Sequence, residues 1–109
     1  MTSPIIGKWQ QPEGQPFAGL WFLFAEDGTF HANYAEMGID SYGTYTATDG
    51  VIDMDQTRHT LGLIGKFSGR YAIEGDTLSM NLSDTGESRP ETLEGKNRRL
   101  YKRILDDLK

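Results

Sequence analysis

The 109-residue sequence contains no cysteine, four prolines and two histidines, and it has no long apolar run. The lack of cysteine excludes a disulfide scaffold, a thiolate metal site and a cysteine nucleophile. No stretch approaches the ~20 apolar residues that a membrane helix needs, so we expect no membrane association. The first seven residues have neither the basic region nor the apolar region of a signal peptide, so we expect a cytoplasmic protein.

Positive charge is also scarce, because 11 lysines and arginines stand against 16 aspartates and glutamates, for a net charge of -5. An acidic domain has no general attraction for phosphate backbones, so we do not expect nucleic acid as a partner. A chain of this length forms one domain, residues 1–109, with a single core. We leave open whether copies of the chain associate into a homo-oligomer.

Glycine is abundant, with 13 residues spread through the chain. Asp27-Gly28, Asp49-Gly50 and Gly75-Asp76 separate runs rich in aromatic and β-branched residues, which is typical of β-hairpins. No convincing helix appears in the body of the chain. We predict eight strands, over Ile5–Gln11, Phe17–Ala25, Thr29–Glu36, Asp40–Thr48, Val51–Thr60, Lys66–Glu74, Thr77–Ser83 and Arg98–Ile104.

The register of each hairpin follows from the turn length that places apolar residues on one face. Two-residue turns satisfy this condition at Asp49-Gly50 and at Gly75-Asp76. They pair Ala47 with Ile52, Tyr45 with Met54, Ile73 with Leu78, Tyr71 with Met80 and Gly69 with Leu82.

The turn at Asp27-Gly28 needs a different length, because a two-residue turn would pair Phe24 with a histidine. A three-residue loop with Gly28 in the left-handed conformation, a type I turn with a G1 bulge, restores the apolar face. It pairs Phe24 with Phe30, Phe22 with Ala32 and Leu20 with Tyr34.

Eight strands with one apolar face, and no helix to cover it, must close on themselves or form a sandwich. The short connections favour an up-and-down order. We therefore predict an all-β fold, an eight-stranded antiparallel up-and-down barrel. Such a barrel is either filled by side chains or holds one small ligand.

Gly7-Lys8-Trp9 matches the G-x-W signature of lipocalins and other calycins, and Gly69–Leu78 with Arg89-Pro90 resembles small bacterial lipocalin-like domains. The resemblance spans nearly the whole chain and implies a lipocalin-like barrel. In that family the signature tryptophan closes one end of the barrel beneath an arginine of the last strand. The resemblance therefore implies this role for Trp9, with Arg99 or Arg103 above it.

The candidate ligand-binding residues are those that strand alternation places on the inner face of the barrel. Continuing from Ile52 and Met54, alternation places Arg58 inside the barrel mouth, where its guanidinium would hold an anionic or carbonyl group or pair with an acid such as Glu36. A slipped register after Gln56 would instead turn Arg58 outward. The inward tyrosines either contact a ligand or fill the core. The candidate ligand-binding residues are Tyr34, Tyr45, Met54, Arg58 and Tyr71.

Other polar residues have alternative roles. Strand alternation places His31 and His59 on the outer face of the sheet. They are either solvated strand residues or part of a metal site. We predict no metal and no cofactor. Asp53 and Asp55 point outward together, as a paired-carboxylate site or as solvated acids. The connection with Arg89-Pro90 is a lid over the mouth or a simple link whose arginine pairs with a surface acid.

We therefore expect a barrel that binds a small apolar or amphipathic molecule carrying an anionic or carbonyl group. An enzyme that uses the same mouth, such as an isomerase, hydratase or cyclase, is the first alternative. A structural or assembly module with a filled barrel is the second. No nucleophile or acid/base pair in the sequence decides whether a reaction is catalysed.

Overall fold

A computed structural model describes residues 5–95 and 97–104. It contains eight strands and one short 3-10 helix, η1. Within these residues, no helix has the length and apolar character needed to cross a membrane. The elements are β1 (Gly7–Gln10), β2 (Trp21–Phe24), β3 (Thr29–Tyr34), η1 (Ala35–Met37), β4 (Ile39–Thr48), β5 (Val51–His59), β6 (Gly65–Glu74), β7 (Thr77–Leu82) and β8 (Arg98–Ile104).

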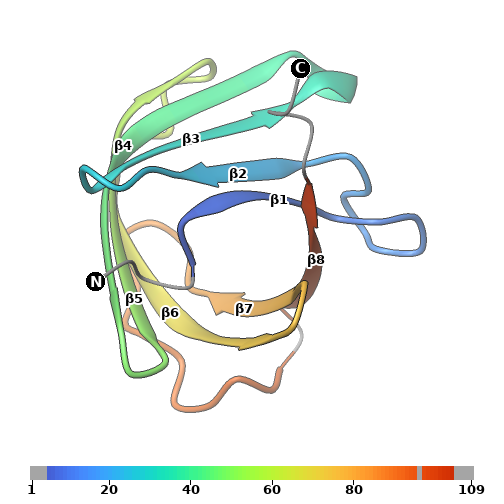
Figure 1. Cartoon of the computed structure of the whole chain (residues 1–109). Helices are drawn as coiled ribbons and strands as arrows, with labels where there is room; N and C mark the ends of the chain where they lie inside the picture. The colour runs from blue at the N-terminus through green and yellow to red at the C-terminus, as the bar shows by residue number, and fades with distance from the viewer. Residues whose placement is uncertain (1–4, 96, 105–109) are drawn as a thin grey trace.

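The eight strands form a closed antiparallel barrel in sequence order (Figure 1). Each strand pairs with the next, and β8 returns to pair with β1, where Lys8 lies opposite Ile104. Within the described residues, closure gives every strand a paired neighbour on both sides. The predicted all-β, up-and-down barrel is confirmed.

The three hairpin turns have the predicted registers. Asp49 and Gly50 both have positive φ, 54° and 82°, as a type I′ turn requires. Gly28 has φ 90° and ends the three-residue loop that pairs Phe24 with Phe30. The expected pair of Leu20 with Tyr34 lies beyond the ladder, because β2 begins only at Trp21.

The inward faces of the strands form one apolar core, in which the largest side chains are less than a tenth exposed. Two glycines let the strands approach closely. A Cβ on Gly43 would lie 1.9 Å from Asp55 O, and one on Gly69 would lie 2.2 Å from Asn81 O. Such positions are where a small barrel can bend sharply. The core residues are Ile5, Trp9, Phe22, Phe24, Phe30, Ala32, Ile52, Met54, Leu78, Met80 and Tyr101.

Trp9 is fully buried, and its Nε1 donates a hydrogen bond to Ile5 O at 2.8 Å. The Arg103 guanidinium lies 4.2 Å from the centroid of the Trp9 ring, donates to Ile6 O, and lies 3.4 Å from Asp76 Oδ1. Of the two arginines that the resemblance offered, Arg103 is therefore the one that covers the tryptophan. We call the end of the barrel that holds Trp9 and Arg103 the closed end.

The antiparallel order places the other four connections together at the opposite end, which we call the mouth. They are residues 11–20 between β1 and β2, residues 35–38 with η1, residues 60–64 between β5 and β6, and residues 83–95 and 97 between β7 and β8. The three tight turns all lie at the closed end.

Candidate functional site

Two hollows adjoin at the mouth and share three walls, Phe17, Leu20 and Phe22. The first has a volume of about 240 Å³ and is almost entirely apolar. We call it the apolar hollow, and Ala32, Asn33, Tyr34, Met37, Ile39, Ser41 and His59 complete its lining. The second has about 230 Å³ and a mixed lining that is more apolar than polar, and we call it the polar hollow because it holds the charged and amide side chains. Gln11, Phe67, Met80, Leu82, Ser83, Asp84, Asn97, Arg99 and Tyr101 complete it.

Phe17 stands between the two hollows. Its ring makes an edge-to-face contact with Tyr34, with the ring centroids 6.0 Å apart. On the other side, the Arg99 guanidinium carbon lies 5.5 Å from the centroid of the Phe17 ring. The side chain is 43% exposed, so it lies across the opening rather than in the core. Phe17 therefore divides one mouth into an apolar and a polar part.

Gln11 fastens the loop that carries Phe17. Its side chain is 2% exposed, accepts a hydrogen bond from Phe17 N at 3.2 Å, and donates one to Tyr101 Oη at 3.2 Å. Gln15 Oε1 accepts a further bond from Leu100 N on β8. The β1–β2 connection is thus held on the last strand, and the sequence prediction of a strand from residue 17 is wrong in this segment.

Tyr101 is a buried titratable group at the floor of the polar hollow. Burial raises the pKa of its phenol to about 12 from an ordinary value of 10, against smaller opposing effects of the Gln11 hydrogen bond and the nearby Arg99 charge. The phenol is therefore neutral throughout the physiological range and serves as a hydrogen-bond partner, not as a base.

This pKa predicts a loss of stability in alkali. Because the pKa of Tyr101 is higher in the folded than in the unfolded protein, its neutral phenol contributes to the free energy of unfolding. This contribution is fully present below pH 10 and is lost as the pH rises toward 12. A pKa shift of this size corresponds to a loss of about 3 kcal/mol in the free energy of unfolding. Urea unfolding of the wild type should show this decline, and Tyr101→Phe should show a much shallower one. Equal slopes for the two proteins would contradict the burial of the phenol.

His59 and Ser41 lie directly opposite each other on β5 and β4 and both line the apolar hollow. His59 Nδ1 accepts a hydrogen bond from Leu61 N at 3.0 Å. Tyr34 donates its hydroxyl to Glu36 at 3.0 Å, which raises the pKa of the phenol. Among the described residues, no carboxylate is hydrogen-bonded to His59, so the hollow offers polar contacts without an acid/base pair.

The inward placement of Arg58 is wrong. Gly43 pairs with Gln56 but Tyr42 pairs with Arg58, so a β-bulge leaves Thr57 without a partner and reverses the parity beyond it. Arg58 is exposed, and its guanidinium carbon lies 5.3 Å from the Tyr42 ring centroid on the outer wall. The same reversal corrects the expectation for His59, which lines the mouth. Of these two neighbours, the predicted ligand contact Arg58 points outward and His59 points to the mouth.

The other predicted ligand-binding residues are brought together only in part, because Tyr45 and Met54 lie directly opposite each other on β4 and β5, whereas Tyr34 lies apart from them. Tyr34 lies at the mouth, whereas Tyr45 lies toward the closed end, about 20 Å along β4 from the partner of Tyr34. Tyr45 donates to Ala25 O at 2.9 Å, and burial raises its pKa. Met54 is 2% exposed in the core, and Tyr71 is half-buried against it. Ligand contact by these residues stays a prediction, and only Tyr34 lines the hollows described above.

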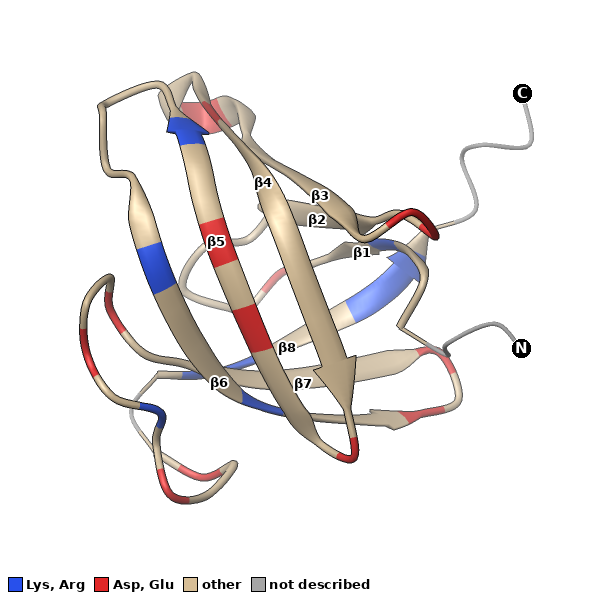
Figure 2. Ribbon diagram, turned by 90° about the vertical axis from the view of Figure 1, so that its left-hand side faces the viewer, with Lys and Arg blue, Asp and Glu red and all other residues tan. Residues whose placement is uncertain are grey.

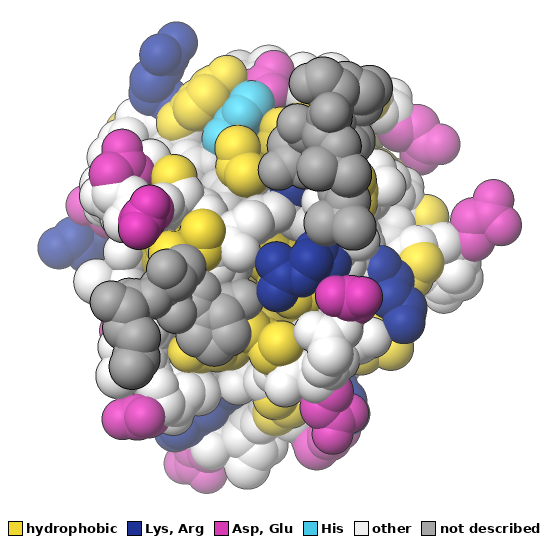
Figure 3. Space-filling view, in the orientation of Figure 1, with side chains coloured by type: hydrophobic (Ala, Val, Ile, Leu, Met, Phe, Trp, Pro, Cys, Tyr) yellow, Lys and Arg dark blue, Asp and Glu magenta, His cyan; other side chains and the backbone are white. Residues whose placement is uncertain are grey.

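The outer wall carries polar and aromatic side chains that engage one another. His31 stacks on Tyr42, with centroids 4.2 Å apart, and bonds Asp40 at 2.9 Å, so it has the outward direction predicted. Hydrogen bonds from Asn33 and His31 lower the pKa of Asp40. Figure 3 shows charged side chains of both signs spread over one face of the molecule, with hydrophobic ones between them. His31 therefore fits a structural role on the wall.

The acidic pair on β5 also points outward, as predicted, and Asp53 forms an ion pair with Arg89. Figure 2 shows the acidic positions of β5 on this wall and the β7–β8 connection beside β6. A groove of about 350 Å³ adjoins the wall and that connection, and the predicted site residues Tyr45 and Met54 line it together with Asp53, Asp55, Lys66 and Glu87. Arg89 thus pairs with a surface acid, which is the simpler of its two expected roles.

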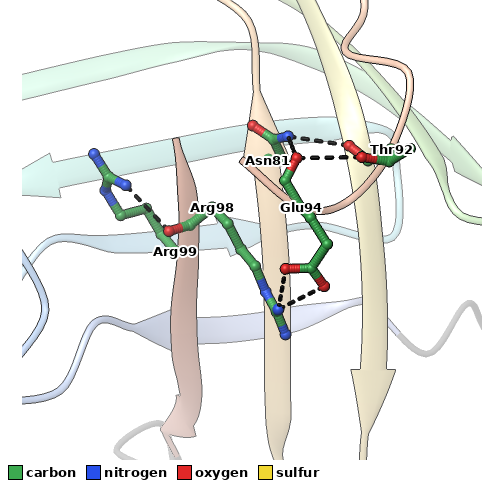
Figure 4. Close-up of polar contacts among 5 residues, drawn as sticks. All are labelled: Asn81, Thr92, Glu94, Arg98 and Arg99. Carbon is green, nitrogen blue, oxygen red and sulfur yellow. Dashed lines mark hydrogen bonds and ion pairs between the residues drawn. The ribbon is translucent and has the colours of Figure 1, made fainter. Parts of the chain in front are cut away.

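The β7–β8 connection lies against the outer face of the barrel. Asn81 on β7 is 5% exposed and donates from Nδ2 to Thr92 O at 3.0 Å and to Glu94 O at 3.2 Å (Figure 4). Glu94 pairs with Arg98 at 2.7 Å. Residues 86–94 are therefore fixed to the wall, and the expectation of a lid over the mouth is wrong for this part of the connection. Its two ends, at Ser83-Asp84 and Asn97, line the polar hollow.

In residues 5–95 and 97–104, no group of three or more His, Asp or Glu side chains is placed to hold a metal ion. No protein-family model, no curated protein and no solved structure matches the chain. The closed eight-stranded barrel is compatible with a lipocalin-like fold. The site therefore has to be interpreted from its own geometry.

Proposed function

We propose that the protein is a lipocalin-like module that binds one small amphipathic molecule at the mouth of the barrel. The observation that carries the proposal is the junction at Phe17 of two hollows, one almost entirely apolar and one with both apolar and polar walls. Concave, mostly apolar sites with a few convergent polar groups are the usual geometry of small-molecule binding. Together the hollows have room for about fifteen water-sized groups, at ~30 Å³ each.

The chemistry of the lining orients the ligand. An apolar tail fits among Leu20, Phe22 and Ile39 in the apolar hollow. An anionic or carbonyl head group fits the polar hollow, where Arg99 points inward from β8 opposite Met80. A guanidinium forms charge-assisted hydrogen bonds with carboxylates and carbonyls, and it does so best where water is scarce. Arg99 thus replaces Arg58 as the proposed anchor.

Replacing this anchor should weaken binding of a charged ligand selectively. We expect Arg99→Met to reduce the affinity for decanoate by about 1.5–3 kcal/mol, the usual contribution of a charge-assisted bond. The affinity for decanol, which has the same tail and no charge, should change much less. Isothermal titration calorimetry measures both values.

Arg98→Met is the matched control, because Arg98 points outward and pairs with Glu94 on the wall. It should leave both affinities unchanged. Equal losses for decanoate and decanol in Arg99→Met would indicate a packing defect and would remove Arg99 from the site. No binding of either compound to the wild type would contradict the proposed ligand class.

We also propose that the protein works in the cytoplasm and belongs with the small bacterial lipocalin-like domains. The support is a chain without cysteine, which draws no stability from an oxidising compartment, and the Trp9–Arg103 closure. Native mass spectrometry of protein isolated from its own host should find a small molecule retained in the complex.

A further inference from the structure

The β5–β6 connection presents three large aliphatic side chains to solvent. Leu61, Leu63 and Ile64 are 62%, 58% and 58% exposed. Loop tips normally carry Gly, Pro, Asn, Asp and Ser, and clustered exposed aliphatic residues mark interaction surfaces. The exposed aliphatic side chains of this loop therefore indicate an interaction surface.

The loop is held in place by its own backbone. Gly62 N donates to His59 O and Ile64 N donates to Gly62 O, both at 2.9 Å. Gln56 on β5 also donates its side-chain amide to Leu63 O. Because these bonds fix the backbone, the three side chains are presented as an ordered projection. We call Leu61, Leu63 and Ile64 the aliphatic tip.

The aliphatic tip lies beside the apolar hollow. Thr60 N donates to Asp40 O at 3.0 Å and Asp40 N donates to Thr60 Oγ1 at 2.8 Å, so the loop begins next to the start of β4. Ile39, which directly precedes Asp40, lines the hollow, and so does Met37 of η1, which is 64% exposed. The mouth therefore carries an apolar projection and an apolar depression side by side.

Because the apolar projection lies next to an apolar depression, the mouth of one copy is complementary to the mouth of a second copy. We propose that two copies of this chain associate through their mouths, each placing its aliphatic tip in the apolar hollow of the other. A two-fold axis produces this reciprocal contact, in which the same patch serves on both subunits. A leucine or isoleucine side chain has four heavy atoms, so two of them match the ~240 Å³ of the hollow at ~30 Å³ per group.

The charges at the mouth favour a second copy over a lipid surface. Glu36, next to Met37, and Arg58, on the outer wall at the mouth end of β5, are both exposed and have opposite signs. Opposite charges on one patch can face each other across a two-fold axis. A membrane-binding surface instead uses basic residues to attract anionic lipids, and this chain has a net charge of -5.

Sedimentation velocity of the wild-type protein, from micromolar to millimolar chain concentration, tests the association directly. We expect a monomer–dimer equilibrium that Leu63→Ser weakens about tenfold or more, as removal of a central apolar anchor does. Leu23→Ser is the matched control, because Leu23 is 38% exposed on β2 and outside both hollows, and it should leave the equilibrium unchanged. Circular dichroism should show that both variants are folded.

A wild type that stays monomeric at every concentration would overturn the proposal, and so would an unchanged dimer in Leu63→Ser. Flotation of the monomeric protein with neutral phosphatidylcholine vesicles would overturn it in favour of a lipid surface. Because the hollow also belongs to the proposed ligand site, decanoate should convert dimer to monomer. A dimer that ignores decanoate, together with no decanoate binding to the Leu63→Ser monomer, would leave association standing and contradict the proposed ligand site alone.

Discussion

Trp9→Ala should lower the free energy of unfolding by about 3–5 kcal/mol, the usual cost of truncating a large buried aromatic side chain. The indole is fully buried, donates to Ile5 O and lies beneath the Arg103 guanidinium. Its removal leaves a cavity at the closed end and takes away the ring that Arg103 covers. Urea unfolding at neutral pH measures the change.

Trp21→Ala provides the matched control for this experiment. Trp21 is the other tryptophan, but it is only partly buried and packs on the outer wall against His31 and Lys8. Its truncation should cost about 1 kcal/mol, in the range of a cross-strand surface pair. A Trp9→Ala protein no less stable than Trp21→Ala would show that the closed end is not held by Trp9.

Gly43→Ala should be the second strongly destabilising change, at roughly 3 kcal/mol, near the upper end for overpacking a core. An added Cβ would lie 1.9 Å from Asp55 O and 2.9 Å from the Phe30 ring. Relief requires β4 and β5 to move apart beside the bulge at Thr57. Thermal and urea unfolding would both register the loss.

Gly75→Ala separates this clash from the general cost of replacing a glycine. Gly75 has φ 59° in a tight turn, and an added Cβ there meets nothing within 4 Å. Its substitution should cost only the left-handed strain of about 1 kcal/mol. If Gly43→Ala cost no more than Gly75→Ala, the close approach of β4 and β5 would be disproved.

The fold could be predicted because turn chemistry and alternation agree along most of the chain. Gly28, Gly50 and Gly75 each supply the positive φ that their turns require, and each turn fixes the register of a hairpin. One face of every hairpin is then apolar, so without helices the strands either close or form a sandwich, and the short connections favour the up-and-down closed barrel. These are local rules, so a single sequence is sufficient to apply them.

The site was harder to predict, because it depends on two departures from those rules. No Gly or Pro marks the bulge at Thr57 on its own strand, and the signal is Gly43 on the facing strand. Phe17 was assigned to a strand, although Pro12, Gly14, Pro16 and Gly19 indicate a loop around it. The bulge shifts the alternation by one residue, which turns Arg58 outward and His59 inward. Simple alternation therefore gives the wrong orientation for both residues.

We propose that the mouth, and not the closed end or the outer groove, holds the ligand. The most direct test is a ¹⁵N–¹H NMR titration of the Leu63→Ser protein with decanoate. Shift changes should concentrate on residues around the two hollows, with Phe17, Ser41 and Arg99 among the largest. Changes centred instead on Thr46, Asp53 and Lys66 of the outer groove, with the mouth unaffected, would contradict the account.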